Sequence, residues 1–155
     1  MLTIRFHPIA GPALDALRAG GPDAYGLPAE QRLSDGGRLP CRCCLGMIPH
    51  GRAYLIAAWR PFDTLHPYAE TGPVFFCADC APAEPTEALP AMLDSPAYIL
   101  RGYDRAQRTV YGTGGVVPRG QITARAAELL AQGDIAHVDV RSAANNCFHT
   151  RILRA

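Results

Sequence analysis

The sequence predicts an α+β fold: a single compact domain over residues 1–155 that is mainly antiparallel sheet, with one clear helix and two zinc-knuckle-like turns. Three observations support this prediction. Short apolar or alternating runs, typical of strands, are separated by segments rich in Gly and Pro. One segment repeats apolar residues at clear helical spacing, namely Ile122, Ala126, Leu129 and Leu130. Four cysteines form two Cys-x-x-Cys pairs.

The composition fits a domain with its own core. Of 155 residues, 48% are hydrophobic and 19% charged, and a domain of this size buries roughly 70% of its unfolded surface. A bound metal would therefore pin a local region instead of replacing a missing core. The net charge of +1, with arginines scattered along the chain, gives little drive toward nucleic acid. Nucleic acid is not expected as a partner.

The N-terminal residues 1–8 lack the apolar stretch of a signal peptide, and no run is long enough to cross a bilayer. We therefore expect a cytoplasmic protein that does not contact a membrane. In a reducing compartment, paired cysteines favour metal ligation or redox chemistry over disulfides.

The first half of the chain predicts three strands and a short helix. Residues 2–6 alternate as a half-buried strand does, and residues 12–18 can form a helix with Leu14 and Leu17 facing inward. The segment from there to Leu39 is rich in Gly, Pro and Asp and is expected to be the loosest part. Two apolar strands follow, at residues 52–59 and 74–76.

The second half predicts two hairpins around the helix. The strand at residues 97–103 is expected to pair with residues 109–111, and Gly133 is expected to cap the helix. The closing hairpin joins residues 135–141 to residues 147–152.

The register of the closing hairpin can be predicted from its turn. If Arg141 lies opposite Cys147, then Asp139 faces His149 and His137 faces Arg151. One face is then polar throughout, and the other faces the core.

The cysteine pairs indicate a zinc site. A Cys-x-x-Cys turn presents two sulfurs on one side, and two such turns complete a tetrahedral shell. The predicted ligands are Cys41, Cys44, Cys77 and Cys80. Four thiolates leave no open coordination position, which argues against hydrolytic zinc chemistry. Free or redox-active thiols, and an iron–sulfur cluster, remain alternatives.

A fifth cysteine, Cys43, could compete as a ligand. The wider spacing favours the Cys41–Cys44 pair, and Gly46 allows the chain to turn just after it. We expect Cys43 to be a buried bystander.

The sequence resembles the bacterial "domain of unknown function 1203" family over essentially its whole length. The resemblance is carried by Pro40–Leu45, Pro67–Phe75, Arg101–Asp104, His137–Arg141 and Cys147–Phe148. It implies a small cytosolic bacterial protein and supplies no activity. In that family a histidine commonly stands where this chain has Cys77, and histidine is also a zinc ligand.

Two further groups of residues are candidates for function. Cys147, His149 and Asp139 have the residue types of a nucleophile, a base and its orienting acid, although these types also occur on an ordinary polar sheet face. A pocket could instead gather Tyr68, Glu70, Arg101, Tyr103 and Arg141, in which the arginines receive a carboxylate or phosphate. The alternative is that these arginines form structural salt bridges.

The sequence therefore favours a small binding or accessory module with a structural zinc site. The alternative is an enzyme that uses Cys147 or the Tyr68–Glu70 loop. Substrate, partner and oligomeric state are not predicted.

Overall fold

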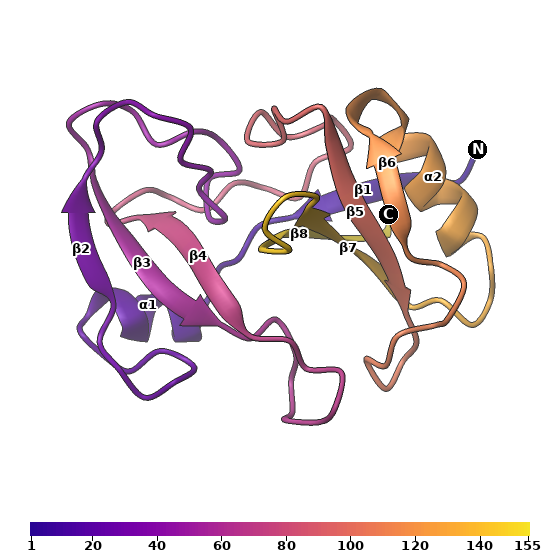
Figure 1. The fold of residues 1–155 in the computed structure, drawn as a ribbon, viewed down its shortest axis with the longest axis horizontal. Helices are drawn as coiled ribbons and strands as arrows, with labels where there is room; N and C mark the ends of the chain where they lie inside the picture. Colours follow the sequence, from indigo (N-terminus) through magenta and orange to yellow (C-terminus); the bar gives the residue numbers. More distant parts are fainter.

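The computed structural model describes all 155 residues and contains two antiparallel sheets, each with a helix packed nearby (Figure 1). The elements, in chain order, are β1 (Ile4–His7), α1 (Pro12–Arg18), β2 (Glu30–Leu33), β3 (Ala53–Trp59), β4 (Gly72–Cys77), β5 (Ala97–Tyr103), β6 (Gly115–Pro118), a 3-10 turn (Arg119–Gln121), α2 (Ile122–Leu130), β7 (His137–Ser142) and β8 (Phe148–Arg154).

The larger sheet has five strands in the order β1-β8-β7-β5-β6, and with α2 it occupies the right half of Figure 1. Helix α2 buries Ile122, Ala126 and Leu130 against this sheet. The resulting cluster of 17 buried residues also takes in Val138 and Val140 of β7. This is the main core of the protein.

The smaller sheet has three strands in the order β2-β3-β4, and with α1 it occupies the left half of Figure 1. Leu14 and Leu17 of α1 are buried, as predicted, in a second cluster of 11 residues. This cluster includes Phe76 of β4 and Phe148 of β8. The second core thus packs against the start of a strand that belongs to the larger sheet.

A buried arginine ties the two sheets together. Arg42 is only 2% exposed, and its Nε donates to the backbone oxygen of Phe148 at 2.8 Å. Its backbone amide donates to Phe75 of β4, and its backbone oxygen accepts from Ile9. Burial lowers the pKa of this guanidinium to about 10, so it remains charged at neutral pH.

Most predicted strands are confirmed, but two assignments in the less regular segments were wrong. β2 lies in the region expected to be loosest; its residues are all exposed, so no apolar alternation marks it. Residues 109–111 contribute only an isolated bridge, between Thr109 and Tyr103. The strand that pairs with β5 is β6.

The helix cap was also predicted wrongly. The C-cap of α2 is Ala131, in right-handed conformation, and Gly133 is not among the glycines with positive φ. The chain leaves the helix without a left-handed glycine.

The predicted register of the closing hairpin was wrong. Asp139 lies opposite Arg151 instead of His149, and Arg141 lies opposite Phe148 instead of Cys147. The register shifts between Val140 and Arg141, and the turn closes by a hydrogen bond from the Ser142 amide to the Cys147 oxygen. Alternation alone does not reveal such a bulge.

The polar face of this hairpin is covered instead of exposed. Asp139 is fully buried, and His137 is 4% exposed. The segment between β3 and β4 covers this face, since Pro61 accepts a hydrogen bond from Arg151 and Glu70 pairs with Arg141.

Both helices are too short to span a membrane.

Candidate functional site

The fold brings the four predicted cysteine ligands into one cluster. The Sγ atoms of Cys41, Cys44, Cys77 and Cys80 all lie within 4.8 Å of one another, and Cys41 Sγ is 3.6 Å from Cys80 Sγ. Cys41 and Cys77 are buried, and the other two are partly exposed. Each pair contributes one inner and one outer sulfur.

The first pair sits on a tight turn that precedes β3. The Cys41 amide donates to the Gly46 oxygen at 2.8 Å, and the Leu45 amide donates to the Cys41 oxygen at 3.0 Å. Leu45 has a φ of 60°, which is the left-handed region. Leu45 therefore makes the turn that the sequence assigned to Gly46, whose φ is not positive.

The second pair is positioned by the β3–β4 hairpin. Cys77 ends β4 opposite Tyr54 of β3, and the Ala78 amide donates to the Ala53 oxygen at 3.0 Å. The antiparallel return of β4 along β3 carries the chain back to the first turn. It thereby closes the long gap between the two cysteine pairs.

The electrostatics of the cluster favour one thiolate in the absence of a cation. The hydrogen bond from the Cys44 thiol, with others from backbone amides, lowers the pKa of Cys41 to about 4. That same hydrogen bond raises the pKa of Cys44. Burial, followed by the charge on Cys41, raises the pKa of Cys77 to about 12 and of Cys80 to about 11.

Groups around the sulfurs are arranged to stabilise negative charge. The amides of Cys77 and Cys44 point at Cys41 Sγ, at 3.2 and 3.5 Å. Arg18 donates to Cys80 Sγ at 3.4 Å and to the Cys77 oxygen at 2.9 Å. Outer donors of this kind orient and tune the ligands of a metal site.

Cys43 lies beside this cluster and is not one of its four sulfurs. It is fully buried, as predicted, and its Sγ contacts the backbone oxygen of Cys80 at 3.9 Å. All six cysteines are free thiols.

The predicted nucleophile, base and orienting acid do not contact one another through their side chains. His149 Nδ1 lies 3.1 Å from the backbone oxygen of Cys147, and Cys147 Sγ lies 3.7 Å from the Asn145 oxygen. Asp139 instead accepts two hydrogen bonds from Arg151, at 2.7 and 2.9 Å. The catalytic role of these three residues stays a prediction.

The structure brings four of the five predicted pocket residues together. Glu70 bridges two arginines, with Oε1 3.0 Å from Arg101 Nη1 and Oε2 3.0 Å from Arg141 Nη1. Arg101 also donates to the Tyr103 hydroxyl at 3.3 Å. Tyr68 lies apart, with its hydroxyl 2.9 Å from that of Tyr111. Ligand binding by this group stays a prediction.

Sequence reasoning missed several residues around these sites. Arg18 and Arg42 approach the cysteine region from a helix and from within the first turn, and Asn145 and Asn146 border the Arg141 region from the last turn. Of these residues, only Arg42 could have been found from the sequence, because it lies between two predicted ligands. The other contacts arise from tertiary packing.

Comparison with known proteins identifies the family. Residues 38–154 match the model of a protein family of unknown function, DUF1203. The chain belongs to the DUF1203 family. The DUF1203 match includes both cysteine pairs and the Glu70–Arg141 region, and it begins after β2. No curated protein and no solved structure matches the chain.

Proposed function

We propose that this DUF1203 protein is a small binding or accessory module whose smaller sheet is held by a structural zinc ion. The ligands are Cys41, Cys44, Cys77 and Cys80. The observation that carries this proposal is the convergence of their four sulfurs within 4.8 Å. Sulfurs around a tetrahedral zinc at about 2.3 Å stand roughly 3.8 Å apart, close to the 3.6 Å between Cys41 and Cys80.

The chemistry of the donor set supports zinc over free thiols. Three thiols whose pKa is raised, chiefly by burial or by the hydrogen bond to Cys41, surround one thiolate, and a divalent cation would favour the charged form of all four. Four thiolates around a divalent ion carry two excess negative charges. The side chain of Arg18 and the amides that face Cys41 oppose that excess.

The role is structural because the protein fills every coordination position. A catalytic zinc keeps one position open for water or substrate, and four thiolates leave none. The ion would join the first turn to the end of β4, beside Arg42, which links the two sheets. The metal thus fixes how the smaller sheet meets the larger one.

An enzyme that uses Cys147 is the second candidate, because Cys147 lines a cavity together with Arg141. The contacts favour it less, since His149 Nδ1 faces a backbone oxygen instead of the Cys147 sulfur. Rapid alkylation of Cys147 by iodoacetamide at neutral pH would favour this candidate. Labelling at the rate of an ordinary exposed thiol would count against it.

Native mass spectrometry with elemental analysis tests the zinc proposal. The untagged protein should carry one zinc per chain. Cys41→Ser and Cys80→Ser should each lose it and unfold at lower temperature, while the matched controls Cys43→Ser and Cys147→Ser should keep it. Metal-free wild-type protein with the same melting temperature as the zinc-loaded form would refute the proposal.

A further inference from the structure

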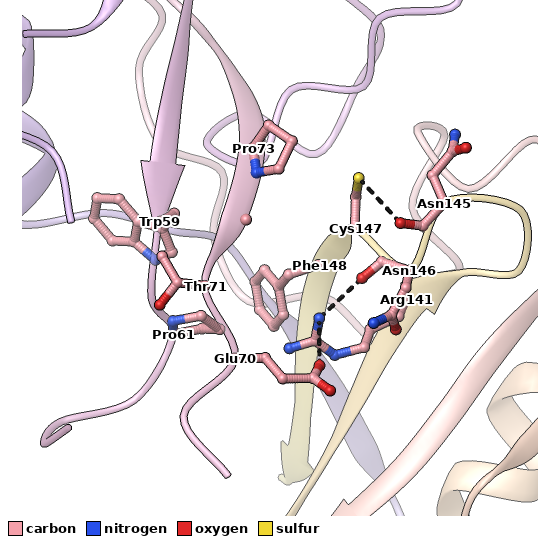
Figure 2. Close-up of a pocket in the computed structure, with 11 residues that line it drawn as sticks. Trp59, Pro61, Glu70, Thr71, Pro73, Arg141, Asn145, Asn146, Cys147 and Phe148 are labelled. Carbon is pink, nitrogen blue, oxygen red and sulfur yellow. Dashed lines mark hydrogen bonds and ion pairs between the residues drawn. The ribbon is translucent and has the colours of Figure 1, made fainter. Parts of the chain in front are cut away.

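A cavity of about 310 Å³ lies between the two sheets, and Figure 2 shows its lining side chains. One wall comes from the end of β3, the start of β4 and the segment between them, including Trp59, Pro61 and Pro73. The other comes from Arg141 and the turn that leads into β8. The volume is at the lower end of the range for small-molecule sites. The cavity therefore has room for a ligand the size of a small organic acid.

Arg141 is the unusual residue of this cavity. Its side chain is only 4% exposed, yet Nε and Nη2 have no hydrogen-bond partner. Only Nη1 is engaged, by the Asn146 oxygen at 3.0 Å and by Glu70 at 3.0 Å. A buried cation with unmade hydrogen bonds is costly, so this guanidinium favours a further acceptor.

The two unpartnered nitrogens form one edge of the guanidinium plane. Nε–H and one N–H of Nη2 run parallel, and this fork matches the two oxygens of a carboxylate or phosphate. Glu70 and the Asn146 oxygen occupy only Nη1, so this buried fork has no acceptor within the protein.

The local charge also favours an anion. Glu70 is shared between Arg101 and Arg141, so one carboxylate faces two guanidinium groups. Together the three side chains retain one positive charge, and their partial burial weakens its screening by solvent. A cationic ligand would be repelled by that positive charge.

The other residues that line the cavity indicate the chemistry of the rest of the ligand. Trp59, Phe148, Pro61 and Pro73 present apolar surface, whereas Asn145, Asn146 and Thr71 add a few polar groups. An inorganic ion would leave the apolar walls unused. An acid with a small apolar body would cover them.

We propose that the cavity binds a small organic acid, whose carboxylate or phosphate is received by Arg141 and whose apolar body lies against Trp59 and Phe148. This inference rests on the proposed binding role and names its ligand class; none of the four predicted zinc ligands lines the cavity. Glu70 acts as the internal anion that holds Arg141 and Arg101 in place.

The protein supplies its own probe for the test, because Trp59 is its only tryptophan and lines the cavity. Zinc-loaded protein is titrated with cyclohexanecarboxylate, cyclohexyl phosphate, cyclohexylmethanol and inorganic phosphate, and Trp59 emission is followed. One or both cyclohexyl acids should bind with saturation, and the stronger of them identifies the anionic group. The neutral alcohol and inorganic phosphate should bind at least tenfold more weakly.

Two substitutions should act in opposite directions. Arg141→Gln should weaken binding of the acid about tenfold or more, since it removes charged hydrogen bonds. Glu70→Gln should strengthen binding roughly threefold or more, because it removes a competing and repelling carboxylate. Arg125→Gln is the matched control on α2, where Arg125 pairs only with Glu128, and it should leave affinity unchanged.

The proposal is overturned if neither acid binds, if the neutral alcohol binds equally well, or if Glu70→Gln leaves affinity unchanged or lowers it. Circular dichroism checks the fold of each variant, and the Glu70→Gln comparison still decides if Arg141→Gln does not fold. Native mass spectrometry of the same samples records zinc. Acid binding to a zinc-free chain would sink only the zinc proposal, and a zinc-loaded chain that binds no acid would sink only this one.

Discussion

Leu45 combines two features that usually belong to different residues, a left-handed backbone conformation and a buried apolar side chain. Its backbone adopts the left-handed φ of 60° that turns the chain after Cys44, a conformation in which glycine is normally found. Its side chain is 4% exposed and belongs to the main core beneath α2. The first cysteine turn is thus anchored in the core of the other sheet at the cost of backbone strain.

We predict that Leu45→Gly is less destabilising than Leu45→Ala. Both changes lose the buried side chain, at about 2–5 kcal/mol. Alanine keeps the left-handed strain of roughly 1–2 kcal/mol, whereas glycine relieves it. Urea unfolding of the two variants measures the difference, and a more stable alanine variant would show that the turn is not strained.

Asp139 shows why a catalytic group cannot be identified from residue types alone. It is fully buried, and both of its oxygens accept from Arg151, whose Nη2 also donates to the Pro61 oxygen. A buried pair of this kind holds the β3–β4 connection onto the larger sheet. From sequence, a carboxylate that orients a histidine and one that anchors an arginine look the same.

At the scale of the elements, alternation and apolar runs predicted most of the fold. β3, β5 and α2 were found because burial marks them clearly. β2 was missed because it is an exposed edge strand, and β6 because it is short and exposed at most of its positions. Apolar periodicity reports burial, and so it cannot report a strand held only by backbone hydrogen bonds.

The candidate sites were predictable to different degrees. The cysteine spacing predicted which four sulfurs converge, because each turn is local and its geometry is set by few residues. The pairing of Glu70 with both arginines depends on how one sheet covers the other. The sequence grouped these residues as a pocket or as salt bridges, but the pairing itself is tertiary, and the register shift after Val140 cannot be read from alternation.

Removal of zinc should loosen the smaller sheet selectively. A chelator should increase amide hydrogen exchange in the turn at residues 40–47 and in the β3–β4 hairpin, because the proposed ion would join these segments. β5 and β7 should stay protected, since their core cluster is independent of the cysteines. Exchange that rises equally in both sheets would contradict this division, and zinc added back should restore the original pattern.

At the scale of the whole molecule, two neutral histidines lie between the packed layers. Burial lowers the pKa of His137 and of His149 to about 4; His137 stacks on Tyr103 with ring centroids 5.0 Å apart. In the unfolded chain the pKa of histidine is about 6.5. The unfolded state therefore binds protons that the folded state excludes.

We predict that stability falls as the pH drops from about 6.5 toward 4. The shift of each imidazole corresponds to roughly 3 kcal/mol over that range. Nitrogen NMR of the imidazoles should show both rings neutral at pH 5.5, and denaturant unfolding should follow the same trend. Titration of either ring near pH 6.5 in the folded protein would contradict its burial as a neutral group.

The division into two sheets would give the proposed zinc ion its importance for the whole molecule. The larger sheet has its own core, whereas the smaller one depends on a cluster of 11 residues. Two of the four predicted ligands, Cys41 and Cys77, are members of this cluster, and the other two, Cys44 and Cys80, pack against it. The cavity beside Arg141 lies between the sheets and so depends on their relative position.

X-ray absorption at the zinc edge tests the central claim most directly. Purified protein should give a first shell of four sulfur atoms at about 2.3 Å, with no nitrogen or oxygen neighbour. A shell that contains nitrogen or oxygen, or fewer than four sulfurs, would contradict a closed tetrathiolate site built from Cys41, Cys44, Cys77 and Cys80.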